Sequence, residues 1–261
     1  MGSKADQEVI LSTKQVTKSF GRLMAVNCVD MEVFQNEVLC IVGSNGAGKT
    51  TLLKMLSGGH RVSEGQIFFR GKNVSRQSLI HRARSGIIYS FQLPALFENL
   101  TAWDNVSLAL LIRQKKTLVF YSKTTRFRQS REEARHILEM FNVPPESVAA
   151  SLPHGQRKLL DAAVAFALEP AILLLDEPTS GVSSDEKCEV MDTIMPNIKA
   201  KGTTTIIVEH DMEIVARYGQ RVIVMDQGSV LAQGLPETVM ADEQVRTAVL
   251  GHSPFGKKSV N

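Results

Sequence analysis

A chain of 261 residues with 43% apolar and 22% charged residues has ordinary globular composition, long enough for one large domain or two lobes sharing a core. A net charge of only +3 is too small to indicate nucleic acid by itself, and three widely spaced cysteines argue against a disulfide framework and fit a reducing compartment. The polar residues 1–8 predict no signal peptide. The most apolar run, residues 162–175, is broken by Glu169 and Pro170, so no membrane span is expected.

The first ninety residues are predicted to be mostly strands. The run 38–42 is short, apolar and followed by a glycine, which is typical of a fully buried strand. Helical spacing of apolar residues predicts a helix over 50–57. Strands are predicted at 9–17, 26–34, 38–42, 66–69 and 87–91.

From Leu93 to Glu169 the pattern changes mainly to helix, and strands then return. Thr101 with Asp104 predicts a capped helix start. This alternation predicts an α/β core with a parallel sheet and a helical insert. The predicted elements are helices at 101–111, 131–141 and 155–168, strands at 171–175 and 204–208, and a hairpin about Gln227-Gly228 joining 222–225 to 229–232.

The segment after the third predicted strand, Gly43-Ser44-Asn45-Gly46-Ala47-Gly48-Lys49-Thr50, matches G-x-x-x-x-G-K-[ST]. Glycines allow positive φ and close approach to an anion, and successive amides with a helix N-terminus attract phosphate. Lys49 would supply charge to the β- and γ-phosphates, and the Thr50 hydroxyl is a hard ligand for Mg²⁺. A glycine-rich turn without ligand is the alternative.

Two further predicted strands end in polar side chains. Residues 171–175 lead into Asp176 and Glu177, and residues 204–208 lead into Glu209 and His210. Ligands of open α/β sheets bind outside the carboxyl ends of strands. Asp176 would hold Mg²⁺ and Glu177 would activate water, while the His210 imidazole would donate to the γ-phosphate. A solvated corner and an ordinary histidine are the alternatives.

These three motifs, in this order, resemble the ATP-binding-cassette (ABC) ATPases over residues 9–251. Gln92 resembles the Q-loop glutamine, which touches Mg²⁺ or its water, and Phe20 resembles the aromatic that stacks on adenine. Residues 152–156 stand where the signature L-S-G-G-Q belongs. The resemblance implies a P-loop NTPase (RecA-like) core with a parallel sheet, an antiparallel β subdomain and a helical insert subdomain. The implied nucleotide-binding residues are Phe20, Gly43, Ser44, Asn45, Gly46, Ala47, Gly48, Lys49, Thr50, Thr51, Gln92, His154, Gly155, Gln156 and Asp176, with Glu177, His210, Lys49 and Gln92 catalytic and Thr50, Gln92 and Asp176 serving the metal.

The resemblance also predicts how the chain is divided. Residues 8–251 are expected to form a single ABC ATPase domain, and 252–261 a flexible tail. Within the domain, 8–92 and 169–235 would make the nucleotide-binding core with the β subdomain. Residues 93–168 would make the helical subdomain, and 236–251 a C-terminal helix region.

Within the superfamily the chain is most similar to the ATPase subunits of branched-chain amino-acid importers. The matching segments include Ser90-Phe91-Gln92, Glu209-His210-Asp211-Met212 and the ending from Gly234 to Gly251. The resemblance implies transmembrane permease subunits, a second ATPase subunit in a head-to-tail dimer, indirectly a solute-binding protein, and a place on the cytoplasmic face of the membrane. Importers of urea, amides or aromatic acids share these features.

The signature loop departs from the family pattern. Pro153 replaces the serine, which removes a hydroxyl and a backbone N–H, although proline suits a first helical position. His154 replaces the first glycine, and Ser183 stands where an Asp or Asn is usual. We therefore hypothesise that the site completed by this loop is weak, whereas the site using Lys49 and Glu177 hydrolyses ATP.

Other classes of function remain open from the residues. A soluble non-transport ABC ATPase would carry long insertions or two cassettes, and a P-loop kinase would not need the signature-like loop. A regulatory cassette that does not hydrolyse fits Pro153 but not Glu177 and His210. Residues 105–130 have basic but no acidic residues, which indicates a solvated face or a patch near a membrane partner, with nucleic acid not expected.

Overall fold

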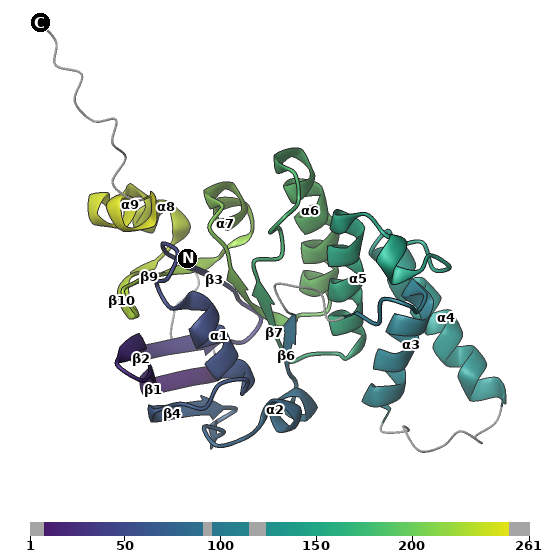
Figure 1. Cartoon of the computed structure of the whole chain (residues 1–261), viewed down its shortest axis with the longest axis horizontal. Coiled ribbons are helices and arrows are strands. Elements are labelled where there is room, and N and C mark those ends of the chain that lie inside the picture. The colour runs from purple at the N-terminus through teal and green to yellow at the C-terminus, as the bar shows by residue number, and fades with distance from the viewer. Residues whose placement is uncertain (1–7, 91–95, 115–123, 251–261) are drawn as a thin grey trace, which may run out of the picture. The chain divides into compact units, whose positions relative to one another are not determined.

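The structure, a computed structural model, describes residues 8–90, 96–114 and 124–250 of the chain (Figure 1). The chain divides into two compact units. The first is Met1–Ser78 with Val208–Asn261, and the second is Leu79–Ile207.

The first unit holds an antiparallel sheet and a group of strands around the phosphate loop. The antiparallel sheet has the order β2-β1-β4-β5. β9 pairs parallel with β3 and antiparallel with β10, while α8 and α9 pack together against β9 (Figure 1). The elements are β1 (Val9–Phe20), β2 (Leu23–Phe34), β3 (Val38–Val42), α1 (Lys49–Ser57), β4 (Glu64–Phe69), β5 (Lys72–Asn73), α7 (Met212–Tyr218), β9 (Arg221–Asp226), β10 (Ser229–Gly234), α8 (Pro236–Ala241) and α9 (Glu243–Leu250).

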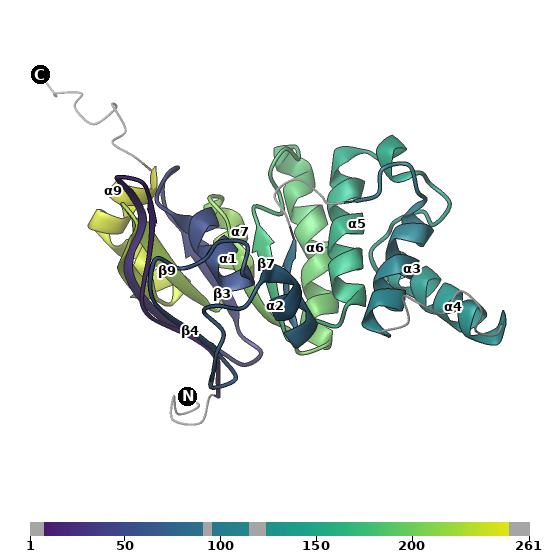
Figure 2. The same cartoon turned by 60° about the horizontal axis from the view of Figure 1, so that its bottom comes forward.

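The second unit combines short buried strands with a row of helices. Its strands have the order β8-β7-β6, and β6 runs parallel to β7. The helices α6, α5, α3 and α4 follow one another side by side, as Figures 1 and 2 both show. The elements are α2 (Leu79–Ser85), β6 (Ile87–Ser90), α3 (Ala102–Arg113), α4 (Thr124–Met140), a 3-10 turn (Ala149–Ser151), α5 (His154–Ala167), β7 (Ile172–Asp176), α6 (Ser184–Ala200) and β8 (Thr204–Val208).

The buried strands confirm the expected α/β class. All five positions of β3, β7 and β8 are buried, as their continuous apolar runs predict for parallel strands covered on both faces. The second sheet, β2-β1-β4-β5, is antiparallel. The fold therefore mixes parallel and antiparallel pairing with helices.

The boundaries show where local signals mislead. The capping box of Thr101 and Asp104 starts α3 as predicted, with both reciprocal bonds present. Pro153 is the residue before α5 and not its first helical residue. Sequence analysis missed α6, because Pro196 lies inside it and proline normally argues against a helix interior. The short helices α2 and α7 were missed as well.

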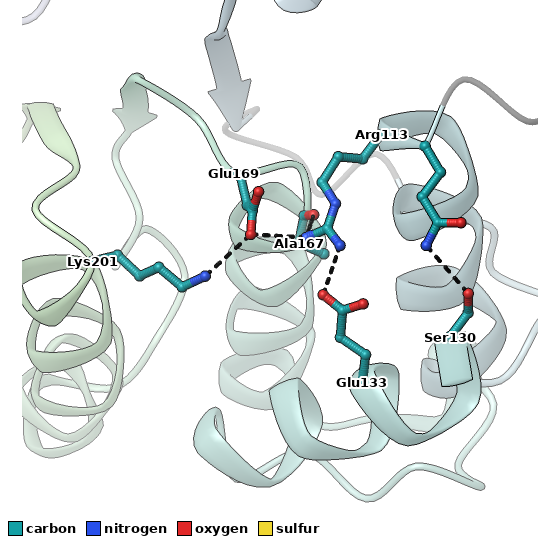
Figure 3. A network of polar contacts seen from close by, with 7 residues as sticks. Arg113, Ser130, Glu133, Ala167, Glu169 and Lys201 are labelled. Carbon is teal, nitrogen blue, oxygen red and sulfur yellow. Dashed lines mark hydrogen bonds and ion pairs between the residues drawn. The ribbon is translucent and has the colours of Figure 1, made fainter. Parts of the chain in front are cut away.

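A polar network in the second unit joins the end of α3, the middle of α4 and the segments that follow α5 and α6 (Figure 3). The Arg113 guanidinium at the end of α3 lies 2.7 Å from Glu133 Oε1 of α4 and 3.1 Å from Glu169 Oε1 after α5. Arg113 also donates to the Ala167 carbonyl, and Lys201 after α6 lies 3.3 Å from Glu169 Oε1. Each of these half-exposed ion pairs adds little stability by itself, but together they link α3 and α4 to the segments after α5 and α6.

Candidate active site

The phosphate loop connects β3 to α1 inside the first unit, and the glycines at its two ends, Gly43 and Gly48, leave no room for side chains. β3 pairs with β9 so that Val42 lies opposite Val224, which brings the start of the loop beside Met225. A Cβ at Gly43 would lie 2.2 Å from the Met225 carbonyl oxygen, and one at Gly48 would lie 2.2 Å from that of Ala25. Gly48 has a φ of +98°, which an L-residue adopts only at a cost. The backbone therefore demands glycine at both ends of this loop.

Lys49 is the first residue of α1, and its ammonium turns back onto the loop. Its side chain is almost fully buried, and Nζ donates to the carbonyl oxygens of Gly43 at 2.7 Å and Ser44 at 2.9 Å. The first turn of α1 contains no acidic residue, so the positive end of its dipole is not offset there. A buried ammonium beside a glycine-rich loop at a helix N-terminus suits an anion such as a phosphate.

The other predicted residues of the loop differ in exposure. Asn45 and Gly46 are exposed at its tip, whereas Ala47 is buried and its amide donates to the Ser44 carbonyl at 3.1 Å. Thr50 and Thr51 are half-buried in the first turn of α1. The Thr50 hydroxyl is a hard oxygen of the kind that Mg²⁺ prefers.

Phe20 ends β1 in the same unit and presents its ring to solvent. It is 44% exposed. Its edge meets the His60 ring at a centroid distance of 5.4 Å, and Lys18 Nζ lies 4.8 Å from the Phe20 ring centroid. Burial, with the charges of Lys54 and Lys18, lowers the pKa of His60, which keeps that ring neutral at pH 7. An exposed aromatic face is available for a flat ring such as a base.

His210 follows β8 and belongs to the first unit. Its side chain is 54% exposed, whereas the preceding Glu209 is fully buried. The Glu209 amide donates to the Ile41 carbonyl of β3, and the His210 amide donates to Glu209 Oε2 at 3.2 Å. Burial and then the charge of Glu209 raise the pKa of the Cys40 thiol to about 12. Glu209 therefore anchors the segment that carries His210.

Asp176 ends β7 in the second unit and is almost completely buried. The Tyr89 hydroxyl on β6 donates to Asp176 Oδ2 at 2.6 Å. Burial, followed by the hydrogen bond and charge of Asp176, raises the pKa of Tyr89, so the phenol remains a donor at neutral pH. A carboxylate fixed at a strand end in this way is suited to hold a hard cation or its water.

Glu177 follows Asp176 with a backbone that bends out of the strand. Its φ of +49° is in the left-handed region, which is uncommon for a residue other than glycine. Its carbonyl accepts from the Ser180 amide at 3.0 Å and from Lys158 Nζ at 3.5 Å. Since strained backbone often occurs at functional sites, this turn supports the catalytic assignment of Glu177.

The signature-like loop lies in the second unit and bonds to the loop after Glu177. His154 Nε2 lies 3.1 Å from the Ser180 carbonyl oxygen, and Pro153 accepts from the Arg157 amide at 2.9 Å. His154 is exposed, while Gly155 and Gln156 are half-buried at the start of α5. The imidazole of His154 therefore holds this loop to the chain following the acidic pair.

The predicted site residues fall in both units. Phe20, residues 43–51 and His210 belong to the first, whereas Asp176, Glu177 and residues 154–156 belong to the second. Gln92 lies outside the described residues. Across the described ranges, no group of three or more His, Cys, Asp or Glu side chains could hold a metal by itself. A phosphate-bound Mg²⁺ needs only one or two protein ligands, and the Thr50 hydroxyl and the Asp176 carboxylate are each the kind of hard oxygen that this ion prefers.

Three polar residues that hydrogen-bond to the predicted site residues were not predicted from the sequence, namely Tyr89, Lys158 and Glu209. Each lies within three positions of a recognised motif or inside a predicted helix. The detectable signal was a polar side chain in an otherwise apolar run, as at Tyr89-Ser90 and Glu209. Their partners were not detectable, because Tyr89 and Asp176 are 87 positions apart.

Comparisons with known proteins give a consistent family. The model described as ABC transporter matches residues 26–180. The chain is 32% identical over 248 residues to the probable branched-chain amino acid transport ATP-binding protein LivG of Archaeoglobus fulgidus, covering 93% of this chain and 95% of the relative. It is 33% identical over 255 residues to the high-affinity branched-chain amino acid transport ATP-binding protein BraF of Pseudomonas aeruginosa, covering 94% and 98%.

A relative with another cargo is similar to the same degree. The lipopolysaccharide export system ATP-binding protein LptB of Haemophilus influenzae is 32% identical over 244 residues, covering 93% of this chain and 97% of the relative. Among solved structures, the ADP conformation of MJ1267, an ATP-binding cassette of an ABC transporter, has a TM-score of 0.81 at 27% identity, covering 94% and 100%. A dimeric cassette, MJ0796, has a TM-score of 0.75 at 25% identity, covering 87% and 98%.

Proposed function

The chain belongs to the ABC transporter family and is the ATP-hydrolysing subunit of a transporter, and from that premise we propose that it energises an importer of branched-chain amino acids. The observation that carries the nucleotide site is the loop from β3 to α1, where Gly43 and Gly48 admit no side chain and Lys49 is buried over the loop carbonyls. The relatives named for branched-chain amino acids support the cargo.

Each residue of the proposed site has a separate role in ATP hydrolysis. Lys49 exchanges its two carbonyl partners for the β- and γ-phosphate oxygens of ATP, which cancels part of their charge. Phe20 stacks on the adenine ring. Glu177 orients and polarises the attacking water, while His210 donates to the γ-phosphate as charge develops on it.

Magnesium is proposed as the companion of ATP. Thr50, Asp176 and Gln92 are the residues that would hold it or its waters. When bound, Mg²⁺ neutralises charge on the phosphates and fixes their geometry. The Thr50 hydroxyl and the Asp176 carboxylate supply the hard oxygens that this ion prefers over nitrogen or sulfur.

The proposal extends to the assembly. The ATPase would pair head to tail with a second ATPase subunit and dock on permease subunits at the cytoplasmic face of the membrane, with a solute-binding protein acting indirectly. Among the described residues, none of the helices has the length and hydrophobicity needed to cross a membrane. The proposed division into a core with its β subdomain (8–92 and 169–235), a helical subdomain (93–168), a C-terminal helix region (236–251) and a tail (252–261) assigns permease docking to the helical part.

The signature loop makes the two ATP sites of such an assembly unequal. Pro153 has no amide hydrogen and no hydroxyl to offer a γ-phosphate. The site built from Lys49, Glu177 and His210 with the partner's signature would hydrolyse ATP normally. The site completed by residues 152–156 of this chain would be slower by about 10²- to 10³-fold if one donor to the phosphate is lost.

Two kinds of measurement test this proposal, one of ATP hydrolysis and one of the transported solute. Mg·ATP should be hydrolysed by the assembled complex, and a Glu177→Gln subunit should bind ATP while turnover falls by about 10²- to 10⁴-fold. The proteins that co-purify in detergent identify the permease and the second ATPase. Vesicles whose membrane contains that complex, with this subunit facing the interior, should accumulate leucine only when ATP is present inside them. ATP-driven extraction of lipopolysaccharide without leucine uptake would favour the export function of the LptB relative.

A further inference from the structure

Tyr89 makes a contact with Asp176 that the resemblance does not assign. Its hydroxyl donates to Asp176 Oδ2 at 2.6 Å, within the second unit. The tyrosine is 9% exposed and Asp176 is 1% exposed, so solvent has little access to this bond. A hydroxyl donating to a carboxylate at this distance is a strong, charge-assisted hydrogen bond.

The register of the two strands explains why the phenol reaches this carboxylate. β6 and β7 run parallel, with Tyr89 beside Leu174 and Ser90 beside Leu175. Leu174 and Asp176 lie two residues apart on β7, so their side chains leave the same face. The long tyrosine side chain spans the remaining two residues of strand, about 6.6 Å, and its hydroxyl meets Asp176 at the carboxyl end of the strand.

The bond constrains how Asp176 can turn. An ionised carboxylate accepts hydrogen bonds through both oxygens and rotates broadly about its last torsion when nothing holds it. Donation from Tyr89 to Oδ2 selects one orientation of the whole group. The phenol is itself fixed by burial between strands and helices, so that orientation is set before any ligand arrives.

We propose that Tyr89 is a positioning residue, which orients the Asp176 carboxylate for the Mg²⁺ that accompanies ATP. The inference rests on the proposed role of Asp176 at the metal. It assigns Tyr89 no contact with nucleotide or metal. Its effect is expected on the affinity for the ion and not on the affinity for the nucleotide alone.

The experiment compares the full-length chain with its Tyr89→Phe variant, which keeps the ring and removes one oxygen. A non-hydrolysable ATP analogue is titrated first with EDTA and then with excess Mg²⁺. Mn²⁺ is titrated separately at saturating analogue, and free Mn²⁺ is counted by electron paramagnetic resonance. Loss of a partner that orients a metal ligand costs about 10- to 100-fold in metal affinity. We expect Mn²⁺ affinity to fall about 10-fold, because Asp176 would act through a metal-bound water, while analogue affinity in EDTA stays unchanged.

Two further variants separate positioning from folding. Tyr218→Phe removes the same oxygen from another buried tyrosine, in the first unit, and should leave Mn²⁺ affinity at the wild-type value. Asp176→Ala removes both the carboxylate charge and the acceptor of the Tyr89 hydroxyl. If Tyr89 acts through Asp176, adding Tyr89→Phe to Asp176→Ala should cause no further loss of Mn²⁺ affinity, because the two changes share one interaction.

The outcomes distinguish this role from the proposed function. Unchanged Mn²⁺ affinity in Tyr89→Phe overturns the positioning role, as does an equal loss of analogue affinity with and without metal. A full additional loss in the Asp176→Ala background also overturns it. If the wild-type chain binds no analogue under either condition, the nucleotide site itself is wrong, and the inference about Tyr89 fails with it.

Discussion

Gly48 offers the sharpest test of the phosphate loop, because alanine there meets two separate obstacles. Its φ of +98° is a backbone conformation that L-residues seldom adopt. A Cβ would also lie 2.2 Å from the carbonyl oxygen of Ala25 in β2. That oxygen belongs to the backbone, so it cannot swing aside as the end of a long side chain would.

The expected loss of ATP turnover in Gly48→Ala follows from those two observations. A left-handed backbone costs an L-residue about 1–2 kcal/mol. Carbon and carbonyl oxygen normally approach to about 3.3–3.6 Å, so the loop or β2 must shift by about 1 Å. A displacement of about 1 Å in a catalytic arrangement can lower the rate about 10²-fold. Gly48→Ala should therefore lower ATP turnover about a hundredfold and also destabilise the chain.

Gly71 supplies the matched control. It has a φ of +71°, but nothing lies within 4 Å of an added Cβ, and it lies in the turn between β4 and β5. Gly71→Ala should cost the same 1–2 kcal/mol of backbone strain, lowering the melting temperature by roughly 2–8 °C for a chain of this size, with normal ATP turnover. Steady-state hydrolysis and thermal unfolding of both variants are the measurements.

The result that refutes this reasoning is wild-type turnover in Gly48→Ala. Equal loss of turnover in Gly71→Ala would refute it differently, since the effect would then come from general destabilisation. A Gly48→Ala chain that melts like Gly71→Ala but hydrolyses far more slowly would support the proposed geometry of the loop.

Three other changes probe separate parts of the molecule. Pro153→Ser restores a hydroxyl and an amide, so turnover at the weak ATP site of the assembled complex should rise by up to about 10²- to 10³-fold, and unchanged turnover would refute the proposed asymmetry. Thr101→Ala removes the capping box of α3 and should lower the free energy of unfolding by about 1 kcal/mol in denaturant titration; an unchanged midpoint would show that the cap contributes nothing. Since the pKa of Cys40 is raised to about 12, iodoacetamide at pH 8 should label exposed Cys28 and spare Cys40 until the chain unfolds. The unfolded thiol loses its proton near pH 9.0, whereas the folded thiol keeps it to about pH 12, so the free energy of unfolding should fall as the pH rises from 9 toward 12. Labelled Cys40 in the folded chain would contradict the burial argument.

Local sequence patterns were sufficient to predict most of the fold and many residues of the candidate site. The continuous apolar runs of β3, β7 and β8 predicted buried strands, because strands covered on both faces lack polar alternation. The phosphate loop could be predicted because binding a phosphate requires its glycines, lysine and threonine at fixed spacing along the chain. The signal for α6 was weaker, since Pro196 contradicts a helix locally and only packing overrides it.

The sequence by itself determined which backbone conformations and which chemical groups the chain would place at the ends of its buried strands. Only the tertiary structure decided which distant groups meet. Gly48 is confined by Ala25, and the phenol of Tyr89 reaches Asp176. The physical reason is that periodicity and turn chemistry act over a few residues, whereas such contacts depend on strand order and register between segments that lie far apart along the chain.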